Sequence, residues 1–236
     1  MMVSTKYRST APEAMDDFDM EGELLRDALD KIAAINQILG GNRVTLQGVK
    51  ELIGKTSKQT PIHILDLGCG NGDMLRTLAD WGKKNGYNFR LTGIDANDFT
   101  IEHAQNLSKE YGNIDYVCAD IFEDPDNMRC DIALCTLTLH HFKDDEIIGL
   151  VGDLSSRAKM GIVINDLHRN ILAYNLFKAV CFTFGLNEVS EKDGLVSILR
   201  GFKKKDLTLY SKQLNLKKYT IRWKWAFRYQ WIISNI

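Results

Sequence analysis

The 236-residue sequence has little charge imbalance, no long apolar run and few cysteines. A net charge of −1 provides no general attraction to nucleic acid or to an anionic membrane. No apolar stretch approaches the roughly 20 residues that a membrane-spanning helix needs. Residues 1–19 are polar and acidic, without the apolar segment of a secretory leader. We therefore expect no nucleic-acid partner and no membrane span.

The five cysteines are an odd number, lie far apart and form no Cys-x-x-Cys pair. This distribution predicts reduced, mostly buried thiols in a cytoplasmic protein. A zinc site is disfavoured, because no cysteine pair has ligand spacing and His140 and His141 are adjacent. The sequence thus predicts no metal.

What the sequence does contain is a strand, a glycine-rich turn and a helix in immediate succession. The nearly continuous apolar run over 62–67 predicts a buried parallel strand, and a helical pattern extends from 74 to about 81. Between them lie Gly68, Gly70 and Gly72, whose lack of a Cβ lets the backbone bend sharply and approach a ligand. The helix behind them offers free N–H groups and a positive dipole end.

This turn could bind either a dinucleotide, through its pyrophosphate, or a cationic ligand. A dinucleotide fingerprint requires its third glycine three positions after the second, whereas Gly72 follows Gly70 by two. Asp66 lies within the strand and Asp73 directly follows the turn. Carboxylates at these positions would repel a pyrophosphate and attract a cationic ligand. Spacing and charge together favour the cationic ligand.

Acidic residues also end or follow the next two strands. The segment 89–95 predicts a second strand ending at Asp95, and ligands of doubly wound sheets bind at the carboxyl ends of strands. The Asp95 carboxylate could accept hydrogen bonds from both hydroxyls of a ribose; the alternative is a solvated loop aspartate. A third strand over 114–119 precedes Asp120 and Ile121. Asp120 is the less specific signal, because aspartate is also a common turn residue.

The remaining segments continue the alternation of strand and helix. Strands over 130–137 and 161–165, with a helix over 144–158 between them, complete five alternations and predict an α/β fold with a doubly wound, mostly parallel sheet. At the end of the chain, alternating residues over 219–225 and 227–233 predict an antiparallel pair. Its aromatic side chains, Trp223 and Trp225 among them, are expected to face inward.

Helical segments flank this core. Helices over 23–39 and 46–53, the second with Thr45 as its N-cap, predict an N-terminal helical cap over residues 1–58 beside a domain of residues 59–236. Simple coverage of a sheet edge is an equal alternative. A helix over 168–185 and a connection over 186–200, where Asp193-Gly194 predicts a turn, form an insertion at about 168–203. That insertion would line a substrate pocket or pack as ordinary core.

The sequence Asp-Leu-Gly-Cys-Gly-Asn-Gly-Asp at 66–73 resembles the first motif of the class I S-adenosylmethionine-dependent methyltransferases. The order of the segments over about 60–236 is similar to that of the same family. The resemblance implies a seven-stranded sheet with a reversed last strand, S-adenosyl-L-methionine as cofactor and a small-molecule methyl acceptor. It assigns the methionine part of the cofactor to Asp66, Gly68, Gly70 and Gly72. It assigns the ribose to Asp95, with Ala96 beside it, and the adenine to Asp120 and Ile121. Thr136 is the remaining residue expected to contact the cofactor.

The segment after the fourth strand bears on the chemistry. Family members that methylate base amines or protein amides carry Asn/Asp-Pro-Pro-Tyr/Phe there, whereas residues 137–142 contain no proline. The candidates for a general base are His140, His141 and His168, because histidine titrates near neutral pH. Positioning of the reactants alone could also drive the reaction.

We therefore expect a methyltransferase that acts on oxygen or carbon of a phenol, quinol or polyketide-like acceptor, as a monomer or homodimer. A catalytically silent S-adenosylmethionine-binding subunit is an alternative. A nicotinamide-dependent oxidoreductase is disfavoured by the glycine spacing.

Overall fold

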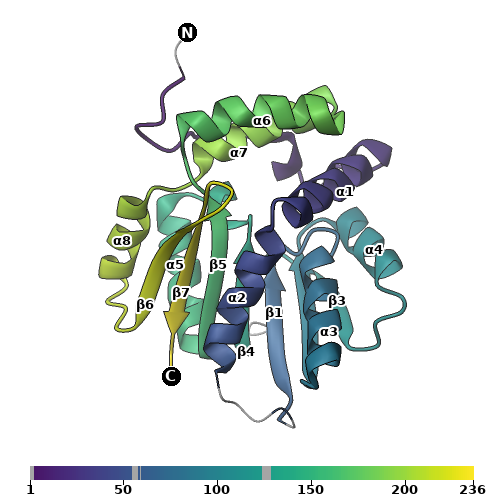
Figure 1. The fold of residues 1–236 in the computed structure, drawn as a ribbon, viewed down its shortest axis with the longest axis vertical. Helices are drawn as coiled ribbons and strands as arrows, with labels where there is room; N and C mark the ends of the chain where they lie inside the picture. The colour runs from purple at the N-terminus through teal and green to yellow at the C-terminus, as the bar shows by residue number, and fades with distance from the viewer. Residues whose placement is uncertain (1–2, 55–57, 59, 124–128) are drawn as a thin grey trace.

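The computed structural model describes residues 3–54, 58, 60–123 and 129–236, which form a seven-stranded sheet with helices on both faces (Figure 1). The strands are β1 (Ile62–Leu67), β2 (Phe89–Asp95), β3 (Ile114–Cys118), β4 (Cys130–Thr136), β5 (Ala158–Leu167), β6 (Tyr219–Lys224) and β7 (Arg228–Ser234). The helices are α1 (Glu23–Ile38), α2 (Gly41–Ile53), α3 (Asp73–Asn85), α4 (Asp98–Leu107), α5 (Asp144–Arg157), α6 (Ile171–Phe184), α7 (Glu188–Arg200) and α8 (Lys204–Gln213), with short 3-10 helices η1 (Ala14–Asp16) and η3 (Leu139–His141). None of the helices in the described ranges is long and apolar enough to cross a bilayer.

The strand order β3-β2-β1-β4-β5-β7-β6 places β1 and β4 at the centre of the sheet. Strand β7 runs antiparallel to both of its neighbours, while β1 to β5 pair in parallel. The carboxyl ends of β1 to β5 therefore meet at one edge, at the top of Figure 1, below α1, α6 and α7. The predicted α/β fold with a reversed last strand is confirmed.

Strand β1 is buried on both faces, which explains its continuous apolar run. Ile64 packs in a cluster that includes Leu78 of α3. Leu65, on the other face, packs in a cluster that includes Leu154 of α5. Such two-sided burial is typical of parallel strands covered by helices.

Helix α2 begins earlier than the sequence pattern indicates and covers the sheet. It starts at Gly41, so Thr45 is an interior helical residue, fully buried, and not an N-cap. Its hydroxyl lies 3.0 Å from Oγ1 of Thr136 on β4. A Cβ on Gly48 would come within 2.5 Å of Val163 on β5, so glycine permits this close helix–sheet contact. The division of the chain at residue 58 stays a prediction.

Residues 188–200 form helix α7 where the sequence predicted an irregular connection with a turn at Asp193-Gly194. That prediction is wrong because both residues make contacts with other segments of the folded chain while they belong to a helix. A Cβ on Gly194 would lie 2.4 Å from Phe177, so glycine lets α7 approach α6. Asp193 accepts hydrogen bonds from the N–H groups of Ala14 and Met15 at the start of η1.

Two predictions about the last strands need correction. Strand β5 continues to Leu167, so Asp166 lies within it and not after it. In the terminal pair Trp231 is fully buried, as expected, but Trp223 and Trp225 are 49% and 65% exposed. They lie at the turn that connects β6 to β7, where Trp225 borders the cavity at the carboxyl ends of the parallel strands. The alternation of aromatic and polar residues along a strand therefore does not show whether the aromatic face is buried in the core or borders a cavity.

Candidate active site

A cavity of about 1420 Å³ lies at the carboxyl ends of the parallel strands. It is lined by strand ends and by residues of α1, α6, α7 and the N-terminal segment. The structure brings all of the predicted site residues to its wall except Gly72. Those that line it are Asp66, Gly68, Gly70, Asp95, Ala96, Asp120, Ile121, Thr136, His140, His141 and His168.

The glycine turn uses conformations that other residues rarely adopt. Gly68, Gly70 and Gly72 have φ values of 66°, 52° and 77°. A Cβ on Gly68 would come within 2.5 Å of Thr138, whereas the space beside Gly70 is open to the cavity, with only Leu29 within 4 Å. Gly72 instead packs on Tyr116, whose hydroxyl oxygen would lie 2.0 Å from a Cβ there. Gly70 is thus the position where a ligand can approach the backbone.

Asp66 supplies a buried carboxylate beneath this turn. Its side chain is 1% exposed, and Oδ1 has no hydrogen-bond partner among the described residues. Burial, reinforced by the charges of Asp73 and Asp95, raises the pKa of Asp66 well above its ordinary value. Burial also raises the pKa of Asp73 and of Asp95. Three carboxylates held in this way favour a cationic ligand, which would lower all three pKa values.

The residues predicted to hold the nucleoside lie on the neighbouring strand ends. Oδ2 of Asp95 accepts a hydrogen bond from the N–H of Gly70 at 3.0 Å, and Oδ1 accepts one from the N–H of Asn97 at 3.2 Å. Oδ1 of Asp120 accepts from the N–H of Phe122 at 2.9 Å, as expected of a turn aspartate. These contacts leave further lone pairs on both carboxylates for ligand donors.

His140 is oriented by Asp166, a residue that the sequence did not assign to the site. Nδ1 of His140 lies 2.7 Å from Oδ1 of Asp166, and the N–H of His140 donates to Oδ2 at 3.2 Å. Both side chains are buried. Burial alone would raise the pKa of Asp166, but the charge and the hydrogen bond of His140 outweigh it and lower the pKa. A carboxylate at Nδ1 favours the tautomer in which Nε2 can accept a proton.

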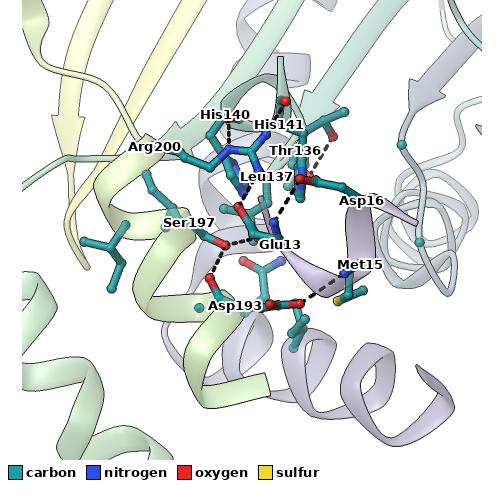
Figure 2. A pocket seen from close by; sticks show the side chains of 18 of the residues that line it. Glu13, Met15, Asp16, Thr136, Leu137, His140, His141, Asp193, Ser197 and Arg200 are labelled. Carbon is teal, nitrogen blue, oxygen red and sulfur yellow. Dashed lines mark hydrogen bonds and ion pairs between the residues drawn. The ribbon is translucent and has the colours of Figure 1, made fainter. Parts of the chain in front are cut away.

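His141 is oriented by a second carboxylate, from the N-terminal segment (Figure 2). Its Nδ1 lies 2.7 Å from Oδ1 of Asp16, and its ring centroid is 4.3 Å from that of His140. Burial would raise the pKa of Asp16, but hydrogen bonds from His141, from the Glu13 backbone and from Arg200 hold it well below its usual range.

Arg200 joins the N-terminal segment to the two histidines. Its guanidinium lies 3.3 Å from Oε1 of Glu13 and 2.6 Å from Oδ2 of Asp16. It also donates to the backbone oxygens of His140 and His141. Sequence reasoning missed Glu13, Asp16 and Arg200, because no local pattern links them to the strand ends.

His168 borders the cavity next to the β6–β7 hairpin. Its Nδ1 accepts a hydrogen bond from Nε1 of Trp223 at 3.2 Å. Burial, with the charges of Lys203 and Arg169, lowers the pKa of His168. It therefore stays a candidate for a proton acceptor, with one ring nitrogen already engaged.

The seven-stranded sheet with its reversed last strand, and the glycine turn that follows its central strand β1, are the features that the resemblance to class I S-adenosylmethionine-dependent methyltransferases predicted. More specifically, residues 64–161 match the family model described as "Methyltransferase domain".

Two curated relatives are O-methyltransferases. The chain is 30% identical over 137 residues to the ubiquinone biosynthesis O-methyltransferase of Coxiella burnetii (strain RSA 493 / Nine Mile phase I), a match that covers 56% of this chain and 53% of that protein. It is 33% identical over 84 residues to the malonyl-[acyl-carrier protein] O-methyltransferase of Acetivibrio thermocellus, covering 35% and 28%. The chain thus spans about half the length, or less, of the curated relatives it matches.

Solved structures share the fold at low sequence identity. The plantazolicin methyltransferase BpumL in complex with SAH superposes with a TM-score of 0.65 and 18% identity, over 90% of this chain and 94% of that one. Human N-acetylserotonin methyltransferase in complex with SAM gives a TM-score of 0.65 and 15% identity, over 91% and 56%.

Proposed function

We propose that this chain transfers a methyl group from S-adenosyl-L-methionine to an acidic hydroxyl or carbon of a small apolar acceptor, such as a phenol, quinol or polyketide-like molecule. The observation that carries the proposal is that one cavity is lined both by Asp66, whose Oδ1 has no hydrogen-bond partner among the described residues, and by His140, whose imidazole is oriented by Asp166. The first suits a cationic cofactor and the second suits removal of a proton. The match to methyltransferases supports the same conclusion.

The residues around the turn fit this cofactor. Gly68 and Gly70 would lie along its amino-acid portion, Asp66 would meet positive charge, and Asp95 would accept from the ribose hydroxyls. Asp120 and Ile121 would border the adenine, with Ala96 and Thr136 at the neighbouring strand ends. When bound, the cofactor supplies an electrophilic methyl group on a positively charged sulfur.

The acceptor side is predominantly apolar. Helix α1 and the α6–α7 insertion contribute Leu29, Ile32, Ala173, Leu176, Phe177 and Ile198 to the cavity wall. We propose that the N-terminal segment to residue 58 and the insertion at about 168–203 enclose an apolar acceptor there. Because the five cysteines are unpaired, we propose the cytoplasm as the setting.

In the proposed reaction the acceptor loses its proton to His140, forms a bond to the methyl carbon, and the carbon–sulfur bond breaks. His140 thereby becomes positively charged, and Asp166 stabilises that charge at Nδ1. Proton removal of this kind contributes about 10²–10⁴-fold, and alignment of the reactants can supply about 7–11 kcal/mol. His141 and His168 are the alternative proton acceptors.

The test combines purified protein, S-adenosylmethionine and a panel of phenols, quinols and amines, with methylated product detected by mass spectrometry. We expect product from a phenol or quinol, and a loss of turnover in His140→Gln of about 10²-fold or more with affinity for S-adenosylhomocysteine retained. The matched variants His141→Gln and His168→Gln identify which imidazole accepts the proton. Cofactor binding without product from any acceptor class would favour the silent-subunit alternative.

A further inference from the structure

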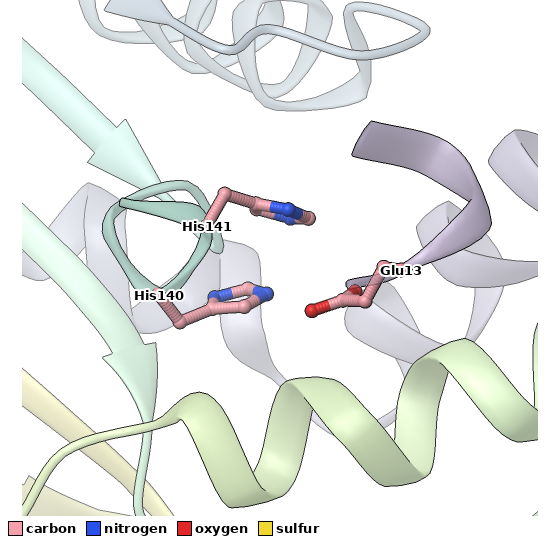
Figure 3. A group of neighbouring side chains, drawn as sticks. All are labelled: Glu13, His140 and His141. Atoms are coloured by element: carbon pink, nitrogen blue, oxygen red, sulfur yellow. The ribbon is translucent and has the colours of Figure 1, made fainter. Parts of the chain in front are cut away.

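Glu13, His140 and His141 form a cluster, whereas proton removal requires only one of the two histidines and does not require Glu13. Each offers one oxygen or nitrogen atom, and these three atoms lie within 4.8 Å of one another (Figure 3). Glu13 lies just before η1, while the two histidines belong to η3. In Figure 3 the Glu13 carboxylate faces the imidazole of His140, with the ring of His141 beside them.

Both histidines are held in the arrangement that metal-binding histidines adopt. Nδ1 of His140 is 2.7 Å from Asp166, and Nδ1 of His141 is 2.7 Å from Asp16. A carboxylate at Nδ1 leaves Nε2 with its lone pair, and histidines that bind metals almost always donate their other N–H to such a partner. A single pair of this kind is common, whereas two adjacent pairs beside a third carboxylate are better explained by a shared ligand.

The Glu13 side chain is buried without full satisfaction of its charge. It is 3% exposed, and its Oε2 accepts a hydrogen bond from Ser197. Oε1 has no hydrogen-bond partner among the described residues, although Nη1 of Arg200 lies 3.3 Å away. A buried carboxylate oxygen in this state is costly, and a bound cation would satisfy it.

The charges around the cluster also favour a cation. The carboxylates of Glu13, Asp16 and Asp166 surround it, and Arg200 pairs with the first two. Three carboxylates less one guanidinium leave two negative charges when both histidines are neutral. A second guanidinium, Arg8, contacts the backbone of His140 but is already paired with Asp144. A divalent ion would bring this local charge to zero.

We propose that Glu13, His140 and His141 bind a divalent transition-metal ion. Two imidazoles and one carboxylate form a three-ligand set that leaves coordination positions open toward the cavity. Imidazole ligands suit ions of the zinc and cobalt type, whereas Mg²⁺ prefers oxygen ligands. One consequence rests on the proposed function: an open position would hold the acceptor hydroxyl and lower its pKa, so that the ion and not His140 would promote loss of the proton.

The experiment uses the tag-free chain of residues 1–236, freed of metal with a chelator and titrated with Co²⁺. We expect a visible absorption band that saturates at one Co²⁺ per chain, is displaced by Zn²⁺ and does not respond to Mg²⁺. Glu13→Gln, which keeps an acceptor for Ser197, and His141→Gln should each abolish the band. Asp16→Asn should weaken binding by about 10- to 100-fold, since it removes only the partner of a ligand.

The matched control is His103→Gln, which removes a histidine–aspartate pair outside the cluster, where Nε2 of His103 lies 2.8 Å from Asp30. The control should bind Co²⁺ like the unaltered protein. Affinity for S-adenosylhomocysteine, measured on the same samples, reports the cofactor site separately, so failure of the metal proposal leaves methyl transfer testable. Absence of the band in folded protein, or a band that persists in both ligand variants, would overturn the proposal.

Discussion

The backbone N–H of Gly70 donates a 3.0 Å hydrogen bond to Oδ2 of Asp95, which joins the glycine turn after β1 to the end of β2. Oδ1 of the same carboxylate accepts from the N–H of Asn97. The Asp95 side chain is therefore fixed before any ligand arrives. A site whose groups are already in place spends less binding energy on ordering them.

Asp95→Ala should abolish measurable binding of S-adenosylhomocysteine. The more conservative Asp95→Asn should weaken it by about one to two orders of magnitude, because a hydrogen bond to a charged group contributes about 1.5–3 kcal/mol. Titration calorimetry measures both, with circular dichroism to confirm the fold. Asp98→Ala, which alters an exposed acid at the start of α4, is the control. Unchanged affinity in Asp95→Ala would refute the ribose role.

Asp66→Asn should separate stability from cofactor affinity. Because folding raises the pKa of Asp66, the unfolded chain ionises first. The free energy of unfolding then falls as pH rises from about 4 through the raised pKa. At higher pH the folded protein keeps the destabilisation that the buried charge causes. Asp66→Asn removes that cost, so the ligand-free variant should have the higher melting temperature at neutral pH, by about 2–4 °C for each kcal/mol recovered.

The same substitution should weaken binding of S-adenosylhomocysteine and flatten its pH dependence. In the unaltered protein, affinity should rise with pH as the carboxylates of Asp66, Asp73 and Asp95 become ionised. Asp115→Asn, at an exposed position of β3, is the control for removal of a carboxylate. A melting temperature and an affinity that both stay constant would show that Asp66 carries no buried charge.

The sequence predicts best those parts of the fold in which neighbouring residues already determine the outcome. Strand β2 occupies the predicted range 89–95, in which Phe89, Leu91 and Ile94 are buried and the strand ends at Asp95. Asp193-Gly194 indicated a turn, but tertiary packing of Gly194 against Phe177 places both residues in α7. Local propensity was overruled there by a contact that only the folded chain contains.

The site residues likewise divide into those that local sequence predicts and those that only contacts in the folded chain bring together. Asp66 and Asp95 could be predicted because the carboxyl ends of parallel strands meet at one edge of a sheet. Asp166 also lies at the carboxyl end of a parallel strand, β5, and could have been found in the same way. Glu13 and Arg200 could not, because they reach the histidines through an N-terminal segment and a helix that no periodic pattern connects.

Gly72→Ala and Gly86→Ala should differ in cost although both glycines have left-handed backbone conformations. Their φ values are 77° and 74°, so alanine at either position incurs about 1–2 kcal/mol of backbone strain. Only at Gly72 would the new Cβ collide with a neighbour, the Tyr116 hydroxyl, whereas nothing lies within 4 Å at Gly86. Overpacking adds about 1–3 kcal/mol.

Thermal melts should therefore show a loss of about 2–8 °C for Gly86→Ala and a larger loss for Gly72→Ala. Because Gly72 does not line the cavity, affinity for S-adenosylhomocysteine should fall less in Gly72→Ala than in Asp95→Ala. Equal melting temperatures for the two glycine variants would contradict the collision with Tyr116.

Arg200→Met should destabilise the protein and release the N-terminal segment from the histidines. The arginine is 8% exposed, pairs with Glu13 and Asp16, and holds two backbone oxygens of η3. Removing one partner of a buried ion pair costs about 3–5 kcal/mol, because the remaining carboxylates stay buried without their cation. Arg222→Met is the matched control, since its ion pair with Glu51 is exposed and should contribute only about 0–1 kcal/mol. Thermal melts measure the difference, and limited proteolysis should cut residues 3–20 faster in Arg200→Met alone. Equal melting temperatures and cleavage rates in the two variants would show that Arg200 does not hold the segment in place.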